Sequence, residues 1–158
     1  MAEPLADQVM RMLKKSAGLY HRLTLVVAPS GSGKTTALRE AASGIGTTLI
    51  NVNLELSKRM LDLTARQRAL QVPRLLDEIA GQISGDTLLL DNLEILFDVA
   101  LKQDPLRLLQ GLSRNRAVAA TWNGLMENNH LTYAAPDHHE YRRYPLGDFL
   151  VASLAALR

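Results

Sequence analysis

The sequence predicts an α/β fold in which about five strands form a doubly wound, mostly parallel sheet within a single domain, residues 1–158. Two observations carry this prediction. Short apolar runs without polar alternation recur along the chain, which is typical of strands buried on both faces. Segments with helical periodicity separate these runs, and this alternation favours right-handed crossovers and a parallel sheet. A length of 158 residues and a hydrophobic content of 47% suit one domain with a sizeable core.

In the first half of the chain, periodicity and helix-breaking residues predict four helical segments and two strands. The helix that follows the glycine-rich segment is expected to end at Gly44 and Gly46. Ser57 is expected to cap a helix, which Pro73 stops or kinks. The predicted helices are Pro4–Ser16, Lys34–Ser43, one that begins at Lys58, and Arg74–Ile83, and the predicted strands are Leu23–Val27 and Thr48–Val52.

The second half of the chain continues the same alternation. A third strand, Thr87–Asp91, is apolar until its acidic end, and a fourth is expected at Ala117–Thr121. A weak fifth strand is expected near Leu131–Tyr133 or around His139–Arg143. The predicted helices are Pro105–Leu112 and the amphipathic Leu146–Leu157.

Composition narrows the classes of function. The absence of cysteine excludes disulfides and thiolate metal sites and suits a reducing compartment. Neither a signal peptide nor a membrane-span-length apolar run is present, so we expect a cytoplasmic protein with no membrane partner. A net charge of +2 is too mild to indicate nucleic-acid binding, and an aromatic content of 4% leaves little material for stacking on bases.

The segment after the first strand has the sequence of a phosphate-binding loop, Ala28-Pro29-Ser30-Gly31-Ser32-Gly33-Lys34-Thr35-Thr36. Gly31 and Gly33 lack side chains, so successive backbone N–H groups can curl around phosphate oxygens. Lys34 supplies charge for the β- and γ-phosphates, and the following helix directs its positive N-terminal end at the same anion. Ala28 replaces the usual first glycine, so the motif is a relaxed form. Its setting between a strand and a helix predicts a P-loop NTPase that binds ATP.

Thr35 and Asp91 are the residues expected to hold Mg²⁺. The hydroxyl of Thr35 follows the loop lysine, where it can ligate the metal. Asp91 ends an apolar strand, and in this class of fold such an aspartate lies beside the phosphate loop. An acid at a strand end can also cap the next helix, so the metal role of Asp91 depends on the loop being present.

Hydrolysis requires a group that orients or deprotonates water. Many related ATPases place a glutamate directly after the aspartate, whereas this chain has Asn92, which leaves fast turnover open. Glu94 and Glu55 are the candidates for the missing role. Asn123 follows the fourth strand, where its amide can bond to the γ-phosphate or the water, although Asn-Gly is also a turn signal.

Surface arginines are candidates for a charge supplied to a neighbouring subunit's phosphate. The four considered are Arg114, Arg116, Arg142 and Arg143. The expected catalytic residues are therefore Lys34, Asp91, Glu94, Glu55, Asn123 and Arg142.

Four segments together resemble BrxF, the family of small P-loop proteins of bacterial BREX phage-defence systems. They are the phosphate-binding loop and residues 91–97, 121–124 and 140–144. The resemblance implies ATP binding, ATP hydrolysis and work alongside other BREX proteins that act on DNA, with any DNA association of this chain indirect or weak. It also implies kinship with AAA+ ATPases, whose sheet has an extra strand between the loop strand and the acidic strand. Thr48–Val52 lies in the corresponding sequence interval.

The segment after Pro145 is too short for the C-terminal helical lid of full AAA+ proteins, so the resemblance implies a site open on one side. A second copy could cover it, and we therefore expect a homo-oligomer that acts as a motor or switch. Two other functions stay open. The chain has the size of some small-molecule kinases, and Asn92 is also compatible with a nucleotide-dependent scaffold that does not hydrolyse ATP.

Overall fold

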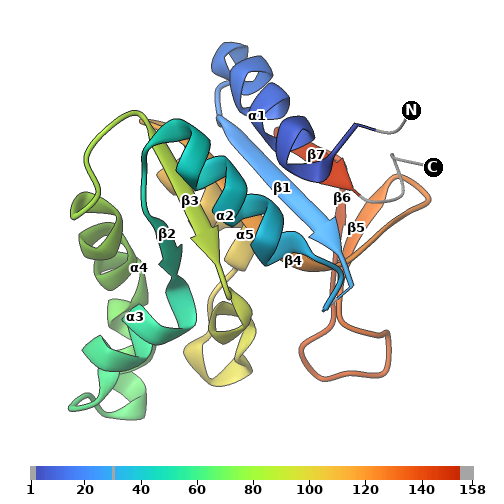
Figure 1. Cartoon of the computed structure of the whole chain (residues 1–158). Coiled ribbons are helices and arrows are strands. Elements are labelled where there is room, and N and C mark those ends of the chain that lie inside the picture. Colours follow the sequence, from blue (N-terminus) through green and yellow to red (C-terminus); the bar gives the residue numbers. More distant parts are fainter. Residues whose placement is uncertain (1–2, 30, 154–158) are drawn as a thin grey trace.

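The computed structural model describes residues 3–29 and 31–153. Five parallel strands lie in the order β2-β3-β4-β1-β7. β5 pairs antiparallel with β4, and β6 pairs antiparallel with β5, which extends the sheet to seven strands (Figure 1). The strands are β1 Leu23–Ala28, β2 Leu49–Asn51, β3 Thr87–Asp91, β4 Ala117–Glu127, β5 His130–Tyr133, β6 Arg142–Pro145 and β7 Leu150–Ser153. The predicted α/β fold with a mostly parallel sheet is confirmed.

Helices cover both faces of the sheet (Figure 1). One face packs against α1 and α2 through Val26, Leu89 and Ala119, and the other packs against α3, α4 and α5 through neighbouring positions such as Leu25 and Leu90. The helices are α1 Leu5–Lys15, α2 Lys34–Ile45, α3 Val52–Met60, α4 Ala65–Gly81 and α5 Pro105–Leu112, and the short 3₁₀ turns are η1 Ser16–Gly18, η2 Glu94–Phe97 and η3 Val99–Leu101. This double coverage explains the apolar strand runs, because successive side chains of each strand enter different cores.

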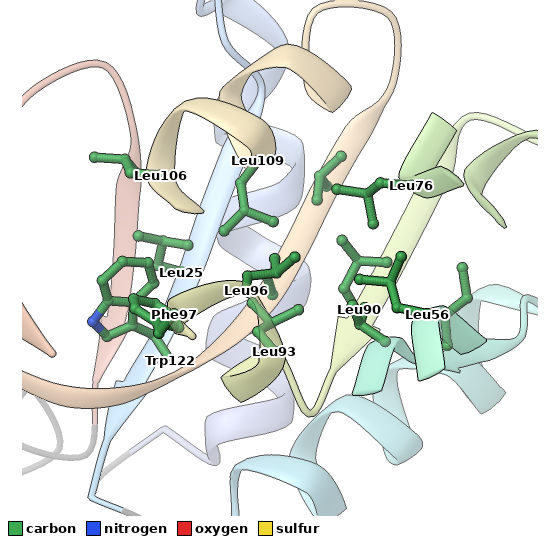
Figure 2. Packing of buried hydrophobic residues seen from close by; sticks show 14 of the residues in the cluster. Leu25, Leu56, Leu76, Leu90, Leu93, Leu96, Phe97, Leu106, Leu109 and Trp122 are labelled. Atoms are coloured by element: carbon green, nitrogen blue, oxygen red, sulfur yellow. The ribbon is translucent and has the colours of Figure 1, made fainter. Parts of the chain in front are cut away.

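An aromatic cluster fixes the segment after β3 against the strand that follows. Phe97 stacks on Tyr133 with ring centroids 3.5 Å apart, and it meets Trp122 edge to face at 5.1 Å. Figure 2 shows Phe97 and Trp122 side by side, with Leu93 and Leu96 continuing the same core toward β3. Burying such large rings contributes several kcal/mol of apolar transfer free energy. The cluster therefore packs η2 against β4 and β5, close to the end of β3.

The strand between the loop strand and the acidic strand is β4, not Thr48–Val52. β4 pairs with both β1 and β3, whereas β2 lies beyond β3 at the edge of the sheet. The inserted strand therefore comes later in the chain than the sequence interval indicated. Both candidate positions for a weak fifth strand contribute, as β5 and as the start of β6, but in antiparallel pairing.

The predicted helix Leu146–Leu157 is wrong over residues 146–153, and residues 154–157 lie outside the described part of the chain. β7 occupies Leu150–Ser153 and pairs in parallel with β1, from Thr24↔Leu150 to Val27↔Ser153. Leu146, Phe149 and Leu150 suit one helical face, but burial against β1 decides the conformation. Gly147, with its high cost in a helix, also weakens the helical alternative.

The prediction that Ser57 caps a helix beginning at Lys58 is also wrong. Ser57 lies inside α3, which begins at Val52 and is capped by the Asn51 side chain accepting from the N–H of Leu54 at 3.1 Å. Thr64 caps α4 through a capping box with Gln67, a signature visible in the sequence. Asn51 was not recognised as the cap of α3 because β2 runs directly into this helix with no intervening loop.

Pro73 lies within α4 and does not end it. Proline has no N–H, so the carbonyl four residues earlier, that of Ala69, loses its helical partner. The Nε2 of Gln103 donates to this carbonyl at 2.7 Å. A side chain from the segment before α5 thus replaces the missing bond, which explains why the helix continues. The helix α2 likewise runs past the expected stop at Gly44 and ends at Ile45, where Gly46, with a φ of +82°, is the C-cap.

Candidate functional site

Polar side chains meet at one edge of the sheet, where β1 and β3 end and where β4 continues past its two parallel neighbours. They line a pocket of about 320 Å³, which we call the strand-end pocket. Its walls are Gly31, Gly33, Lys34, Thr35, Thr36, Asp91, Asn92, Glu94, Thr121 and Asn123. In open parallel sheets, the carboxyl ends of the strands are where ligands bind. Residues far apart in the sequence thus form one hollow, most of them expected from the sequence.

The glycine loop joins β1 to α2 at one wall of this pocket. Gly31 and Gly33 have φ angles of +79° and +95°, a conformation that L side chains rarely adopt. The Ser32 hydroxyl donates to the Pro29 carbonyl and closes the loop on itself. Because α2 begins at Lys34, its unpaired N–H groups and positive dipole end lie at the pocket wall.

The Lys34 side chain is buried and its ammonium is held by the loop itself. Nζ donates to the carbonyls of Ala28 at 2.9 Å and Pro29 at 2.8 Å. Burial lowers the pKa of Lys34, and the nearby carboxylates of Glu94 and Asp91 oppose that decrease. A cation is therefore held next to acidic groups in a site where its charge is weakly solvated and can attract an anion.

Asp91 is the last residue of β3 and is only 4% exposed. Its Oδ1 accepts a hydrogen bond from the Thr121 hydroxyl at 2.8 Å, which orients the carboxylate from the neighbouring strand β4. Sequence reasoning missed Thr121. Its place at the end of a predicted strand, two residues before Asn123, was the signal that could have identified it.

Glu94 lines the pocket between two amide side chains. Its Oε1 accepts from Asn123 Nδ2 at 2.8 Å, and its Oε2 accepts from Asn53 Nδ2 at 3.1 Å. Asn53 is fixed in turn, because its Oδ1 accepts from the N–H of Ile95 at 2.8 Å and its own N–H donates to Asn92 O at 2.8 Å. Asn53 was not expected from the sequence. It is the second residue of α3, two positions after β2 ends, so its nearness to the acidic strand could be inferred only with the strand order in hand.

Two of the expected catalytic residues lie away from the strand-end pocket. Glu55 lies in α3, where its carboxylate pairs with Arg59 at 2.9 Å and Lys58 at 3.6 Å, and the Arg59 hydrogen bond lowers its pKa. Arg142 lies in β6 and donates from Nη2 to the Gln103 carbonyl at 2.8 Å. Neither side chain belongs to the pocket wall.

Two of the three other arginine candidates have structural partners too. Arg116 donates to the carbonyls of Ala80, Ile83 and Gly85, which ties the end of α4 to the start of β4. Arg114 lies over the Tyr20 ring, with its guanidinium carbon 5.7 Å from the centroid. Pro29 borders a neighbouring hollow rather than the strand-end pocket, and Ser30 lies outside the described residues.

Comparisons with known proteins add one partial likeness. No family model matches the chain, and no curated protein matches it. Among solved structures, the chain is similar to PCH-2 from C. elegans, with a TM-score of 0.45 and 18% sequence identity. The similarity covers 78% of this chain and 37% of the PCH-2 chain, so this chain spans little more than a third of that protein's length. The roles of the pocket residues therefore rest on their own geometry.

Two searches of the described residues concern other kinds of site. Within 3–29 and 31–153, no helix is both long and apolar enough to cross a membrane. Over the same ranges, no three His, Asp or Glu side chains gather in a way that could hold a metal ion.

Proposed function

We propose that the chain is a Mg²⁺-dependent P-loop ATPase that binds ATP in the strand-end pocket. The observation that carries the proposal is the assembly, at one sheet edge, of a glycine loop at a helix N-terminus, a buried lysine and two carboxylates. Helix N-termini and glycine loops bind phosphate through backbone N–H groups. The loop carbonyls that now accept from Lys34 can give up its ammonium to phosphate oxygens, since a charge-assisted bond to phosphate is stronger than one to a neutral carbonyl.

The side chains present fit a magnesium ion. The hydroxyl of Thr35 and the carboxylate of Asp91 line the same pocket, and oxygen ligands of this kind suit Mg²⁺, which takes few protein ligands and completes its shell with phosphates and water. Bound there, the ion would neutralise charge on the β- and γ-phosphates. Asp91 is held in orientation by Thr121.

Glu94 is the residue we propose as general base, in place of a glutamate at position 92. Its carboxylate lines the pocket, whereas that of Glu55 is paired outside it. In the proposed step, a water oxygen bonds to the terminal phosphorus as the bond to the ADP oxygen breaks, and the water proton passes to Glu94. Asn123, already bonded to Glu94, would orient the water or the phosphate.

Three variants test this assignment. Lys34→Ala should lose ATP binding measured by calorimetry, and Glu94→Gln should retain binding while phosphate release falls by about 10²–10⁴-fold. Glu55→Gln is the matched control and should leave both quantities unchanged, because its carboxylate lies outside the pocket. Unaltered ATP affinity and turnover in Lys34→Ala would contradict the proposal.

One observation favours a second candidate function, a nucleotide-dependent scaffold that does not hydrolyse ATP. Both carboxylate oxygens of Glu94 already accept a hydrogen bond from an amide, so only their remaining lone pairs are open to an attacking water. Tight ATP binding with no phosphate release from the unaltered chain, with or without partners, would favour the scaffold over the ATPase.

We further propose that this ATPase acts as a motor or switch subunit of a bacterial BREX anti-phage system, together with other BREX proteins. The support is the sequence resemblance to BrxF in residues 91–97, 121–124 and 140–144. A strain carrying the defence locus tests the proposal through the efficiency of phage plating. Lys34→Ala should restore plaque formation, whereas Glu55→Gln should leave protection intact.

A further inference from the structure

A second hollow of about 480 Å³ adjoins the strand-end pocket and shares Asn123 with it. We call it the hairpin hollow. Its walls include Pro29 from the glycine loop, Leu125 and Glu127 from β4, and Ala134, Ala135 and Tyr141 from the segment after β5. The lining is mainly apolar, with one carboxylate, which differs from the polar strand-end pocket.

The hollow exists because β4 continues beyond the parallel sheet. Asn128 and Asn129, with φ of 51° and 60°, form a two-residue turn that returns the chain as β5. Leu125 and Glu127 are two residues apart on β4 and so share a face. Leu125 is 51% exposed, and the Glu127 carboxylate has no hydrogen bond or ion pair among the described residues.

A surface with the opposite charge lies at the other end of the molecule, on the first turns of α4. Arg66 and Leu70 are four residues apart and therefore lie on one helix face, and Leu70 is 72% exposed. With Ala69 and Lys102, they border a hollow of about 430 Å³, and we call this surface the α4 face. Neither Arg66 nor Lys102 has an ion-pair partner among residues 3–29 and 31–153.

We propose that the α4 face of one copy docks on the hairpin hollow of a second copy. Leu70 enters the apolar hollow and Arg66 meets Glu127, so each copy satisfies an exposed apolar side chain and an unpaired charge of the other. We propose a second copy as the partner because this chain carries both surfaces. Each surface is apolar, and their charges are opposite, basic on the α4 face and acidic in the hairpin hollow. Exposed apolar surface beside unpaired charge is typical of interaction sites.

The two surfaces cannot satisfy each other within one copy. Figure 1 shows α4 beyond the β2 edge of the sheet and the β5–β6 hairpin beyond the β7 edge. Since the α4 face and the hairpin hollow are different surfaces, the contact is head to tail. A pair of copies therefore leaves the hollow of one copy and the α4 face of the other free to bind further copies. The assembly is therefore a closed ring or an open chain rather than a simple two-fold dimer.

The position of the hollow links this contact to the nucleotide site. Asn123 lines both cavities and bonds to Glu94, so a neighbour seated in the hollow lies beside the end of the strand-end pocket that holds the proposed base. That the pocket beside the neighbour binds nucleotide rests on the proposed function. The docking contact itself does not.

Sedimentation velocity of the full chain without nucleotide tests the contact. Arg66→Glu and Glu127→Arg should each weaken self-association on the order of tenfold, and the double variant should restore it to near the original value. Leu70→Ser should also weaken association. Because Leu70 is exposed, this substitution should not destabilise the fold, and an unchanged thermal unfolding temperature checks that. Lys15→Glu, the same charge change on α1, is the matched control and should have no effect.

A chain that stays monomeric at every concentration would overturn the proposal. So would association that both charge reversals leave unchanged, or a double variant weaker than either single one. These results are separable from a failure of the proposed function, because the assay contains no nucleotide and ATP binding is measured independently by calorimetry. Loss of ATP binding with the charge-swap pattern intact would leave the docking contact standing.

Discussion

Gly124 is the position where a single methyl group should do most damage. It lies in β4 directly after Asn123, where the hairpin strand β5 crosses closely. A Cβ built at this position would lie 1.8 Å from the Thr132 carbonyl oxygen, 2.9 Å from its carbon and 3.1 Å from Trp122 Nε1. The neighbour is backbone, so no flexible side chain can move out of the way.

The size of the effect follows from the movement required. Restoring ordinary van der Waals separation needs a shift of roughly 1.5 Å between β4 and β5, since non-bonded heavy atoms sit about 3.5 Å apart. That shift breaks the bond from Trp122 Nε1 to Thr132 O, now 3.0 Å long. Overpacking costs about 1–3 kcal/mol and the lost hydrogen bond about 1 kcal/mol. Gly124→Ala should therefore reduce the free energy of unfolding by about 2–4 kcal/mol, a large part of the 5–15 kcal/mol usual for a domain.

Urea denaturation followed by tryptophan fluorescence measures this change, because Trp122 is the chain's single tryptophan and is buried. The matched control is Gly111→Ala in α5, where an added Cβ meets nothing within 4 Å. Alanine at that helical site should stabilise the chain by about 0.5–1 kcal/mol. If Gly124→Ala unfolds at the same urea concentration as the original chain while the control behaves as expected, the added methyl group does not clash with the Thr132 carbonyl.

Three further predictions concern the caps, the proline and the buried phenols. Thr64→Ala should cost about 1 kcal/mol in urea denaturation, whereas Ser57→Ala, in mid-helix, should cost nothing, and equal losses would contradict the assigned cap. Gln103→Ala should destabilise the chain by about 1–3 kcal/mol, because the Ala69 carbonyl loses its donor. In a Pro73→Ala background the loss should be far smaller, since residue 73 then supplies an N–H to that carbonyl, and equal losses in both backgrounds would exclude this role of Gln103. Burial raises the pKa of Tyr133 to about 12, so the neutral phenol favours the folded state below pH 10 and this advantage is lost as pH rises toward 12. Relative to Tyr133→Phe, the original chain should lose on the order of 1 kcal/mol per pH unit in that window, and parallel curves for the two would count against it.

The sequence predicted the parts of the fold that depend on local pattern. Apolar runs located β1 and β3, and the glycine loop fixed the start of α2, because these features depend on residues adjacent in the chain. The place of β4 between them and the strand at Leu150–Ser153 depend on pairing across the sheet. Pairing partners far apart in the sequence leave no local signal, and periodicity at residues 146–157 favoured the wrong element.

The residues of the candidate site also separate into those that local sequence pattern predicted and those that depend on strand pairing. Lys34 and Thr35 follow β1 and Asp91 ends β3, two strands that the sequence located, and all three line one pocket with Asn123. Asn123 lies within β4, which continues to Glu127 instead of ending at Thr121 as the sequence predicted. Asn53 was missed because its role depends on β2 lying beside β3, which the sequence did not establish. Their chemical roles stay predictions until binding and turnover are measured.

The departure from the usual ATPase pattern at position 92 has a conformational explanation. Asn92 has a φ of +54°, in the left-handed region that asparagine tolerates better than glutamate or most other residues. The chain therefore turns sharply after Asp91 and enters η2, so that Glu94 rather than residue 92 takes its place between Asn53 and Asn123. A glutamate at position 92 would have to accept this strained backbone, at a cost on the order of 1–3 kcal/mol. The residue that looked like a lost catalytic group is thus the one that lets a later carboxylate face the pocket.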